Sequence, residues 1–137
     1  MTIIDTSAVV DYLLGVGVAK QVEELMSEGE PAAPDVLVFE VLAVLRRESH
    51  RSAISDDRAA GAIEDLGDLS IELFPSVPLR QRAWALRRNL TSADALFVAL
   101  AEDLDEPFAT KDSSLVGEIA KHSDVAVLDL GDASPSR

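Results

Sequence analysis

Short strand-like runs that lead into acidic residues alternate with helical segments along this chain. The first is Thr2-Ile3-Ile4, directly before Asp5, and a later one is Phe108-Ala109-Thr110, just before Asp112. Two more short strands are predicted at residues 71–74 and 125–128. Strands separated by helices pair in parallel, because the connecting helices have to cross over a face of the sheet. We therefore expect an α/β fold, a three-layer α/β/α sandwich around a central, mainly parallel sheet.

Helical segments fill most of the sequence between these strands, delimited by glycine, proline and capping residues. They are predicted at residues 7–14, 18–26, 36–49, 55–66, 79–89, 91–104 and 113–121. A length of 137 residues suits one domain. We expect this domain to span residues 1–131 and to be followed by a flexible C-terminal tail at residues 132–137.

Composition narrows the classes of function. Acidic residues outnumber basic ones by 25 to 12, which gives a net charge of −13. This charge argues against a protein whose whole surface binds nucleic acid. The absence of cysteine excludes disulfides, zinc–thiolate sites and thiol nucleophiles. The first residues lack the basic start of a secretory signal, and no apolar run reaches the roughly 18 residues of a membrane span. We expect a cytoplasmic protein without membrane contact.

Two acids stand inside apolar helical runs. Glu40 is the only polar residue of the run 36–45, and its neighbours three and four positions away are apolar. A buried carboxylate has to be compensated, and a salt bridge to Arg47 is one way to do so. Asp94 lies in the similar run 93–101, where a capping box with Thr91 is the alternative explanation.

Asp5 and Asp112 each follow a predicted strand and precede a helix. Either could simply cap its helix. In a parallel sheet, however, ligands bind at the carboxyl ends of the strands, where these two acids and the starts of the helices carrying the other two would converge. Four carboxylates close together require cations, and all-oxygen ligands suit Mg²⁺ or Mn²⁺. We expect one or two such ions to be held by Asp5, Glu40, Asp94 and Asp112.

The chain resembles PIN domains and, more narrowly, the VapC-type toxin ribonucleases of bacterial type II toxin–antitoxin systems. The resemblance covers nearly the whole chain, and four motifs carry it: Ile4-Asp5-Thr6-Ser7-Ala8, Phe39-Glu40-Val41-Leu42, the long segment from Leu90 through Asp94 to Ala101, and Ala109-Thr110-Lys111-Asp112. The long third motif is the most specific of them.

This resemblance implies a metal-dependent endoribonuclease whose catalytic and metal-binding residues are the same four acids. It places Thr6 and Ser113 beside two of them as supporting hydroxyls. In a two-metal arrangement, cleavage would leave a 5′-phosphate and a 3′-hydroxyl. The resemblance also implies inhibition by a cognate VapB-type antitoxin. The chain would form a homodimer or a hetero-oligomer with that antitoxin. The antitoxin or the second copy would dock on apolar surface that the core does not use, on the helices at residues 7–14 and 36–49.

Arginines supply the best candidates for contacts with RNA phosphates. Arg47 and Arg51 lie on the face of Glu40 in the predicted helix, and Arg87 and Arg88 come shortly before Asp94. The alternative is that all four are ordinary exposed arginines paired with neighbouring acids. Trp84, the only tryptophan, is predicted to lie in the core rather than to stack on RNA.

Three other functions remain open. A PIN-like module that binds RNA or protein without cleaving it would not need the complete set of four acids. An aspartyl phosphatase usually has a second acid two residues after the first, where this chain has Ser7. A phosphate-accepting receiver domain would need paired acids after the first strand and a mid-chain strand ending in aspartate, and residues 53–55 supply no such strand.

Overall fold

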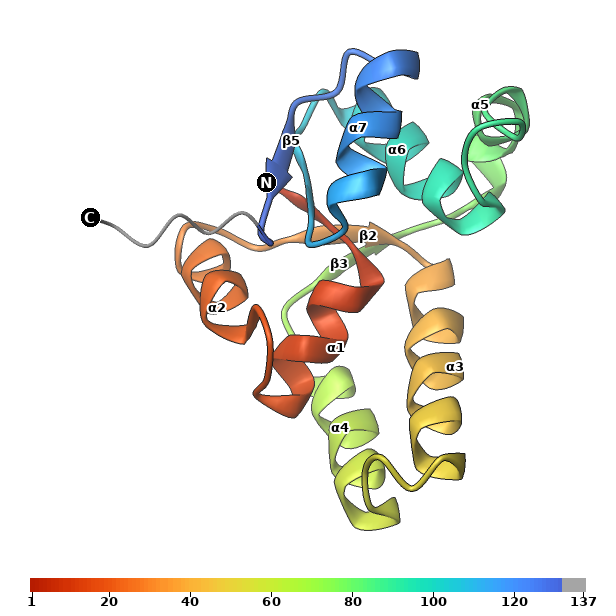
Figure 1. Cartoon of the computed structure of the whole chain (residues 1–137). Helices are drawn as coiled ribbons and strands as arrows, with labels where there is room; N and C mark the ends of the chain where they lie inside the picture. The colour runs from red at the N-terminus through yellow and green to blue at the C-terminus, as the bar shows by residue number, and fades with distance from the viewer. Residues whose placement is uncertain (132–137) are drawn as a thin grey trace.

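A computed structural model describes residues 1–131 of the chain, so the tail predicted at 132–137 lies outside the described residues. Five parallel strands form one sheet in the order β3-β2-β1-β4-β5 (Figure 1). The strands are β1 (Ile3–Ile4), β2 (Ala32–Pro34), β3 (Glu72–Phe74), β4 (Phe108–Thr110) and β5 (Val127–Asp129).

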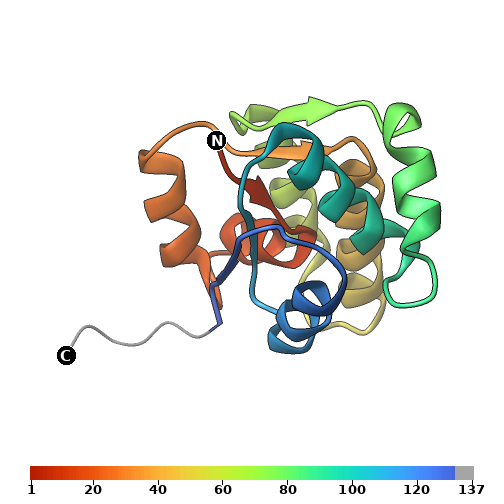
Figure 2. The same cartoon turned by 90° about the horizontal axis from the view of Figure 1, so that it is seen from above.

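Seven α-helices in the described part of the chain form the two outer layers. They are α1 (Thr6–Leu14), α2 (Ala19–Ser27), α3 (Val36–His50), α4 (Asp56–Asp68), α5 (Arg80–Ala85), α6 (Ser92–Leu104) and α7 (Ser113–His122), with a 3₁₀ turn η1 (Val77–Leu79) before α5. Helices α1 to α4 lie on one side of the sheet and α5 to α7 on the other, as Figures 1 and 2 show. The predicted three-layer α/β/α fold is confirmed.

The direction of strand addition explains this division of the helices. The chain adds β2 and β3 on one side of β1, then returns and adds β4 and β5 on the other side. Right-handed crossovers in opposite directions put the helices on opposite faces. The order therefore reverses between β1 and β4, where Ile4 pairs with Ala109. Asp5 and Asp112 follow these two strands at the reversal point, which is where parallel sheets bind ligands.

The core lies between the sheet and its helices. Ile3 and Ile4 of β1 are fully buried, and the rings of Phe97 and Phe108 meet across the α6–β4 boundary with centroids 6.0 Å apart. The buried stripe of α3 is Leu37, Val41 and Leu45, so Glu40 lies beside that stripe and is only half-buried.

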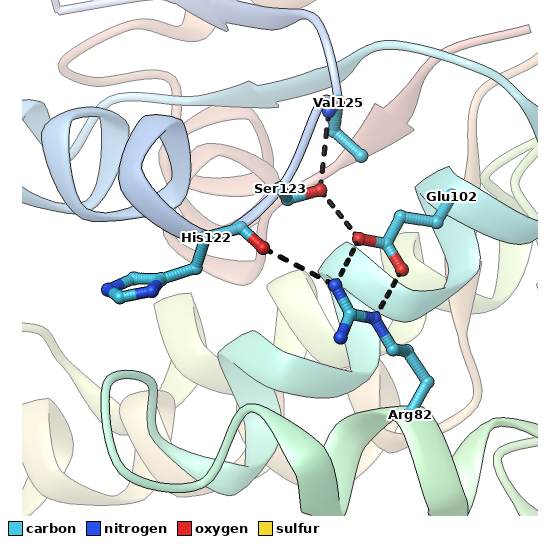
Figure 3. Close-up of polar contacts among 5 residues, drawn as sticks. All are labelled: Arg82, Glu102, His122, Ser123 and Val125. Atoms are coloured by element: carbon cyan, nitrogen blue, oxygen red, sulfur yellow. Dashed lines mark hydrogen bonds and ion pairs between the residues drawn. The ribbon is translucent and has the colours of Figure 1, made fainter.

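A polar network ties the arginine-rich helix α5 to α6 and α7 (Figure 3). Arg82 donates to both carboxylate oxygens of Glu102, at 2.7 and 2.9 Å, and to the carbonyl of His122 at 3.3 Å. The hydroxyl of Ser123 donates to Glu102 at 2.6 Å and accepts from the backbone N–H of Val125 at 3.2 Å. This network fixes α5 next to the helix that carries Asp94.

Several local predictions were wrong. No strand was predicted at β2, because the sequence signals a turn followed directly by a helix. The helix predicted at residues 79–89 is shorter, since α5 ends at Ala85 and a turn follows. Trp84 was predicted to be in the core, but it is 68% exposed, with the Arg87 guanidinium 4.6 Å from the centre of its ring. Helix α5 has only six residues, so the side of it that packs on the core is too small to bury Trp84.

The surplus of apolar surface is found on only one of the two helices. In α1, Val9, Val10 and Leu13 are buried, whereas α3 exposes Phe39 and part of its neighbours. The partly exposed neighbours are Val38 and Leu42. Among the described residues, no helix is long and apolar enough to cross a membrane.

Candidate active site at the carboxyl edge of the sheet

Asp5 is the most firmly held of the four acids. It follows β1 and caps α1, with its Oδ1 accepting from the backbone N–H of Thr6 at 2.7 Å. Its Oδ2 accepts from the hydroxyls of Thr110 at 2.7 Å and Ser7 at 3.3 Å. Burial nevertheless raises the pKa of Asp5 above its usual value, with a smaller contribution from the charge of Asp112.

Glu40 reaches the same place from the second turn of α3. The Thr6 hydroxyl donates to its Oε1 at 2.6 Å, so Thr6 contacts Asp5 through its backbone and Glu40 through its side chain. The salt bridge to Arg47 that could have explained Glu40 is not found among residues 1–131. Arg47 instead lies 3.9 Å from the carboxylate of Glu48.

Asp94 is the third residue of α6. Its backbone N–H donates to the Thr91 hydroxyl at 3.1 Å, so the helix cap proposed for this segment is present. Burial, and then the charge of Asp5, raise the pKa of Asp94 to about 6, and Glu40 and Asp112 contribute in the same direction. Asp94 therefore lies within the electrostatic field of all three other acids.

Asp112 is the most exposed of the four and caps α7. Its Oδ1 accepts from the Ser114 hydroxyl at 2.7 Å and from the backbone N–H groups of Ser114 and Leu115 at 3.0 and 3.1 Å. These bonds lower the pKa of Asp112 below its usual value, with the Ser114 hydroxyl as the largest cause. Asp5 and Asp112 are thus helix caps and members of the acid cluster at the same time.

Thr110 is a site residue that the sequence did not reveal. It is fully buried at the end of β4; its hydroxyl donates to Asp5 and accepts from the backbone N–H of Asp112 at 3.1 Å. Ser113, expected to support an acid, instead donates to Asp129 at 3.3 Å. The signal for Thr110 was its place in the fourth motif, at the carboxyl end of a strand.

All four acids line one cavity of about 650 Å³ between α1 and α3. Of the arginines expected to contact RNA, Arg47 lines this cavity. Arg51 does not, and its guanidinium lies 3.1 Å from Glu48. Arg87 stacks on Trp84, and Arg88 is exposed in the turn after α5. The cavity is also lined by two cations, Arg58 and Lys111, that the sequence motifs did not single out.

The donor set fits a hard divalent cation. It consists of carboxylates positioned by hydroxyl and backbone donors, and the pKa values of two of them, Asp5 and Asp94, are raised first by burial and then by neighbouring like charges. Within residues 1–131, no three acids already form a coordination sphere. Mg²⁺ commonly keeps several of its waters and binds directly to only one or two carboxylates, so such a sphere is not a requirement.

Comparison with known proteins finds relatives that agree with one another on the family. The model of the PIN domain family matches residues 2–128. Ribonuclease VapC1 of Mycobacterium tuberculosis is 41% identical over 115 residues, which cover 82% of this chain and 86% of that protein. Ribonuclease VapC12 of the same species is 29% identical over 128 residues, 93% of this chain and 99% of the relative.

A solved structure agrees with the fold. The crystal structure of PAE2754 from Pyrobaculum aerophilum superposes with a TM-score of 0.70 at 21% sequence identity. The match covers 95% of this chain and 83% of the other. At this identity the likeness supports the three-layer architecture alone.

Proposed function

Because this chain belongs to the PIN domain family, in its VapC-type branch, we propose that it is a metal-dependent endoribonuclease that hydrolyses phosphodiester bonds of RNA. The observation that carries the proposal is the convergence of Asp5, Glu40, Asp94 and Asp112 on one cavity from four separate segments of the chain. The raised pKa of Asp94 supports it, since such shifts gather at functional sites. Residues 1–131 are proposed to form a single catalytic domain, acting in the cytoplasm.

The four acids are proposed to hold one or two Mg²⁺ or Mn²⁺ ions, directly or through water. A bound ion of this kind supplies an activated water and offsets negative charge on the reacting phosphate. Thr6 and Thr110 keep the carboxylates of Glu40 and Asp5 in fixed orientations through bonds of 2.6 and 2.7 Å. Rigid placement of this kind limits the reorganisation needed during the reaction.

Among residues 1–131 no histidine lines the cavity, so the carboxylates themselves are proposed to take up a proton. The pKa of Asp94, about 6 in the metal-free protein, would be lowered by cations bound at the four acids, so no one carboxylate is singled out for this role. Hydrolysis in this arrangement needs no ribose 2′-hydroxyl as nucleophile. The expected products carry a 5′-phosphate and a 3′-hydroxyl.

A VapB-type antitoxin is the proposed partner. A cationic side chain of such a partner could neutralise the acid cluster in place of metal. The exposed apolar residues of α3, namely Val38, Phe39 and Leu42, support the docking of an antitoxin or of a second copy of the chain in a homodimer.

The test is RNA cleavage by the purified chain, with 5′ ends mapped in cellular RNA after induction. We expect cleavage with Mn²⁺ or Mg²⁺, none with EDTA, and none by Asp5→Ala that still folds by circular dichroism. Full activity of Asp5→Ala would contradict the assignment of the site. Failure of the wild type to cleave RNA with either ion would favour a catalytically silent binding module.

A further inference from the structure

The cavity with the four acids continues as a groove along two helices. Its lining follows α1 from Asp5 to Leu14 and α3 from Glu40 to Arg47. Both helices begin at the carboxyl edge of the sheet, so the acids lie at one end of the groove. Farther along, the lining includes three cations: Arg47, Arg58 and Lys111. Asp11 and Glu48 line this stretch as well, so the lining changes from four acids at one end to three cations and two acids along the rest.

Lys111 is the most firmly placed of these cations. Its Nζ donates to Oδ2 of Asp11 at 2.8 Å. Asp11 lies six residues beyond Asp5 in sequence, roughly 9 Å along the axis of α1. The Lys111 side chain is still 37% exposed, and no other acceptor for its ammonium is recorded among residues 1–131. An ammonium has three N–H donors, so two remain for a ligand in the groove.

Asp11 lies within α1, and its side chain bonds to the turn that connects α1 to α2. Only 7% of it is exposed, and its Oδ2 also accepts from the backbone N–H of Val18 at 3.1 Å. Gly17 has φ +53°, and a Cβ at this position would lie 2.1 Å from Asp11 Oδ2. The turn thus leaves room for the carboxylate and holds it in place, and the carboxylate fixes the ammonium at the wall of the groove.

The rest of the groove suits a single RNA strand. Arg58 donates from Nη2 to the carbonyl of Leu14, which holds this exposed guanidinium near the far end of α1. The lining of the groove is also partly apolar, formed by Val10, Leu14, Val44 and Ile54. Cations for phosphates beside apolar contacts for bases are the usual components of single-strand binding.

We propose that Lys111, positioned by Asp11, binds a phosphate of the RNA strand next to the scissile bond. This rests on the proposed ribonuclease function. The ammonium is anchored at Asp11, nearly two turns of α1 beyond Asp5, a place that suits a phosphate next to the one that reacts at the acids. In a chain with a net charge of −13, a fixed cation beside four acids offsets the repulsion of the incoming backbone.

The test compares Lys111→Met with Lys121→Met. Both remove one positive charge, but Lys121 lies on α7 outside the groove, with Glu118 at 3.8 Å. We expect Lys111→Met to raise KM for a single-stranded RNA pool about tenfold with little change in kcat. In an Asp94→Asn background, which binds without cutting, the slope of log Kd against log salt should fall by about 0.7. Lys121→Met should leave KM and the slope unchanged.

If the ion pair only stabilised the fold, the variants would differ in stability, and KM would follow stability rather than the charge at Lys111. Asp11→Asn keeps an acceptor for the backbone N–H of Val18 but removes the charge that anchors Lys111. We therefore expect the double variant Asp11→Asn, Lys111→Met to be more stable than Lys111→Met alone, since it no longer contains an unpaired carboxylate. If the double variant also restores KM, or if Lys111→Met leaves KM and the salt slope unchanged in an enzyme whose wild type cleaves RNA, the inference is overturned while the ribonuclease function stands. Wild type that does not cleave overturns both.

Discussion

Two cavities of similar size differ in how their carboxylates are paired and in the direction in which the pKa values of those carboxylates shift. The cavity where β4 and β5 begin has a volume of about 620 Å³ and contains Glu102, which receives both bonds of the Arg82 guanidinium. These bonds lower the pKa of Glu102. At the other edge of the sheet, in about 650 Å³, Asp5 and Asp94 meet hydroxyls and other acids, and their pKa values rise.

The difference shows that size does not separate a structural cavity from a functional one, whereas charge pairing does. A carboxylate next to an arginine stabilises the fold and has little affinity left for a ligand. Carboxylates that lie together with no arginine or lysine paired to them destabilise the metal-free protein and are kept for binding and chemistry. The variants below test this distinction.

The largest effect is expected from a matched pair, Glu40→Gln and Glu102→Gln. Both remove one negative charge from a half-buried glutamate. Glu40→Gln should lower kcat for RNA cleavage about a hundredfold or more, because it removes a ligand from the acid cluster. Glu102→Gln should keep the kcat of the wild type. Equal losses in the two variants would erase the distinction between the two cavities.

The next effect concerns the support of the acids. Thr110→Val preserves the shape of the side chain but removes the hydroxyl that donates to Asp5 and accepts from the Asp112 backbone. We expect cleavage to fall about 10- to 100-fold, as when groups that orient metal ligands are lost. Ser113→Ala, whose hydroxyl contacts Asp129, is the control and should cost far less. The ratio of the two rates is the measurement.

In the structural cavity, stability should change rather than activity. Arg82→Met leaves Glu102 without its guanidinium, and the free energy of unfolding should fall by about 1 kcal/mol, since both side chains are partly solvated. Arg80→Met is the matched control, because Arg80 contacts only the backbone carbonyl of Val77 among the described residues. Urea denaturation measures both, and a larger loss in Arg80→Met would contradict the role given to Arg82.

The last effect is a pH dependence of stability in the metal-free protein. The pKa of Asp94 rises from 3.8 to about 6 on folding, so the native state binds more protons than the unfolded state in this window. Stability contributed at this site therefore falls as pH rises from about 4 to 6 and is constant above. Asp94→Asn should have a higher Tm than the wild type at pH 7.5 with EDTA, and a similar Tm at pH 4. A lower Tm for Asp94→Asn at pH 7.5 would refute this reading.

The fold and the four acids were accessible from sequence because both leave local patterns. A strand that ends in aspartate before a helix, as at Asp5, identifies the carboxyl edge, and an acid in an apolar run, as at Glu40, stands out against its neighbours. Strand β2 left no such pattern. It has only three residues, two alanines and a proline, and its strand conformation comes from the pairing with β1 and β3.

Contacts between distant segments could not be predicted. The ion pair of Lys111 with Asp11 joins residues 100 positions apart, and Thr110 meets Asp5 across 105. The exposure of Trp84 depends on how short α5 is and on how Arg82 anchors it, neither of which the apolar pattern records. Such features follow from packing, which a single sequence does not specify locally.

The position of β4 has a consequence for the synthesis of this protein. Strand β4 lies between β1 and β5 in the sheet, yet it comes late in the chain, and Asp112 follows it. Until that segment has left the ribosome, β1 lacks one of its two neighbouring strands and Asp5 lacks the hydroxyl of Thr110. A growing chain therefore has no complete acid cluster. The late segment from β4 to Asp112 therefore completes the acid cluster.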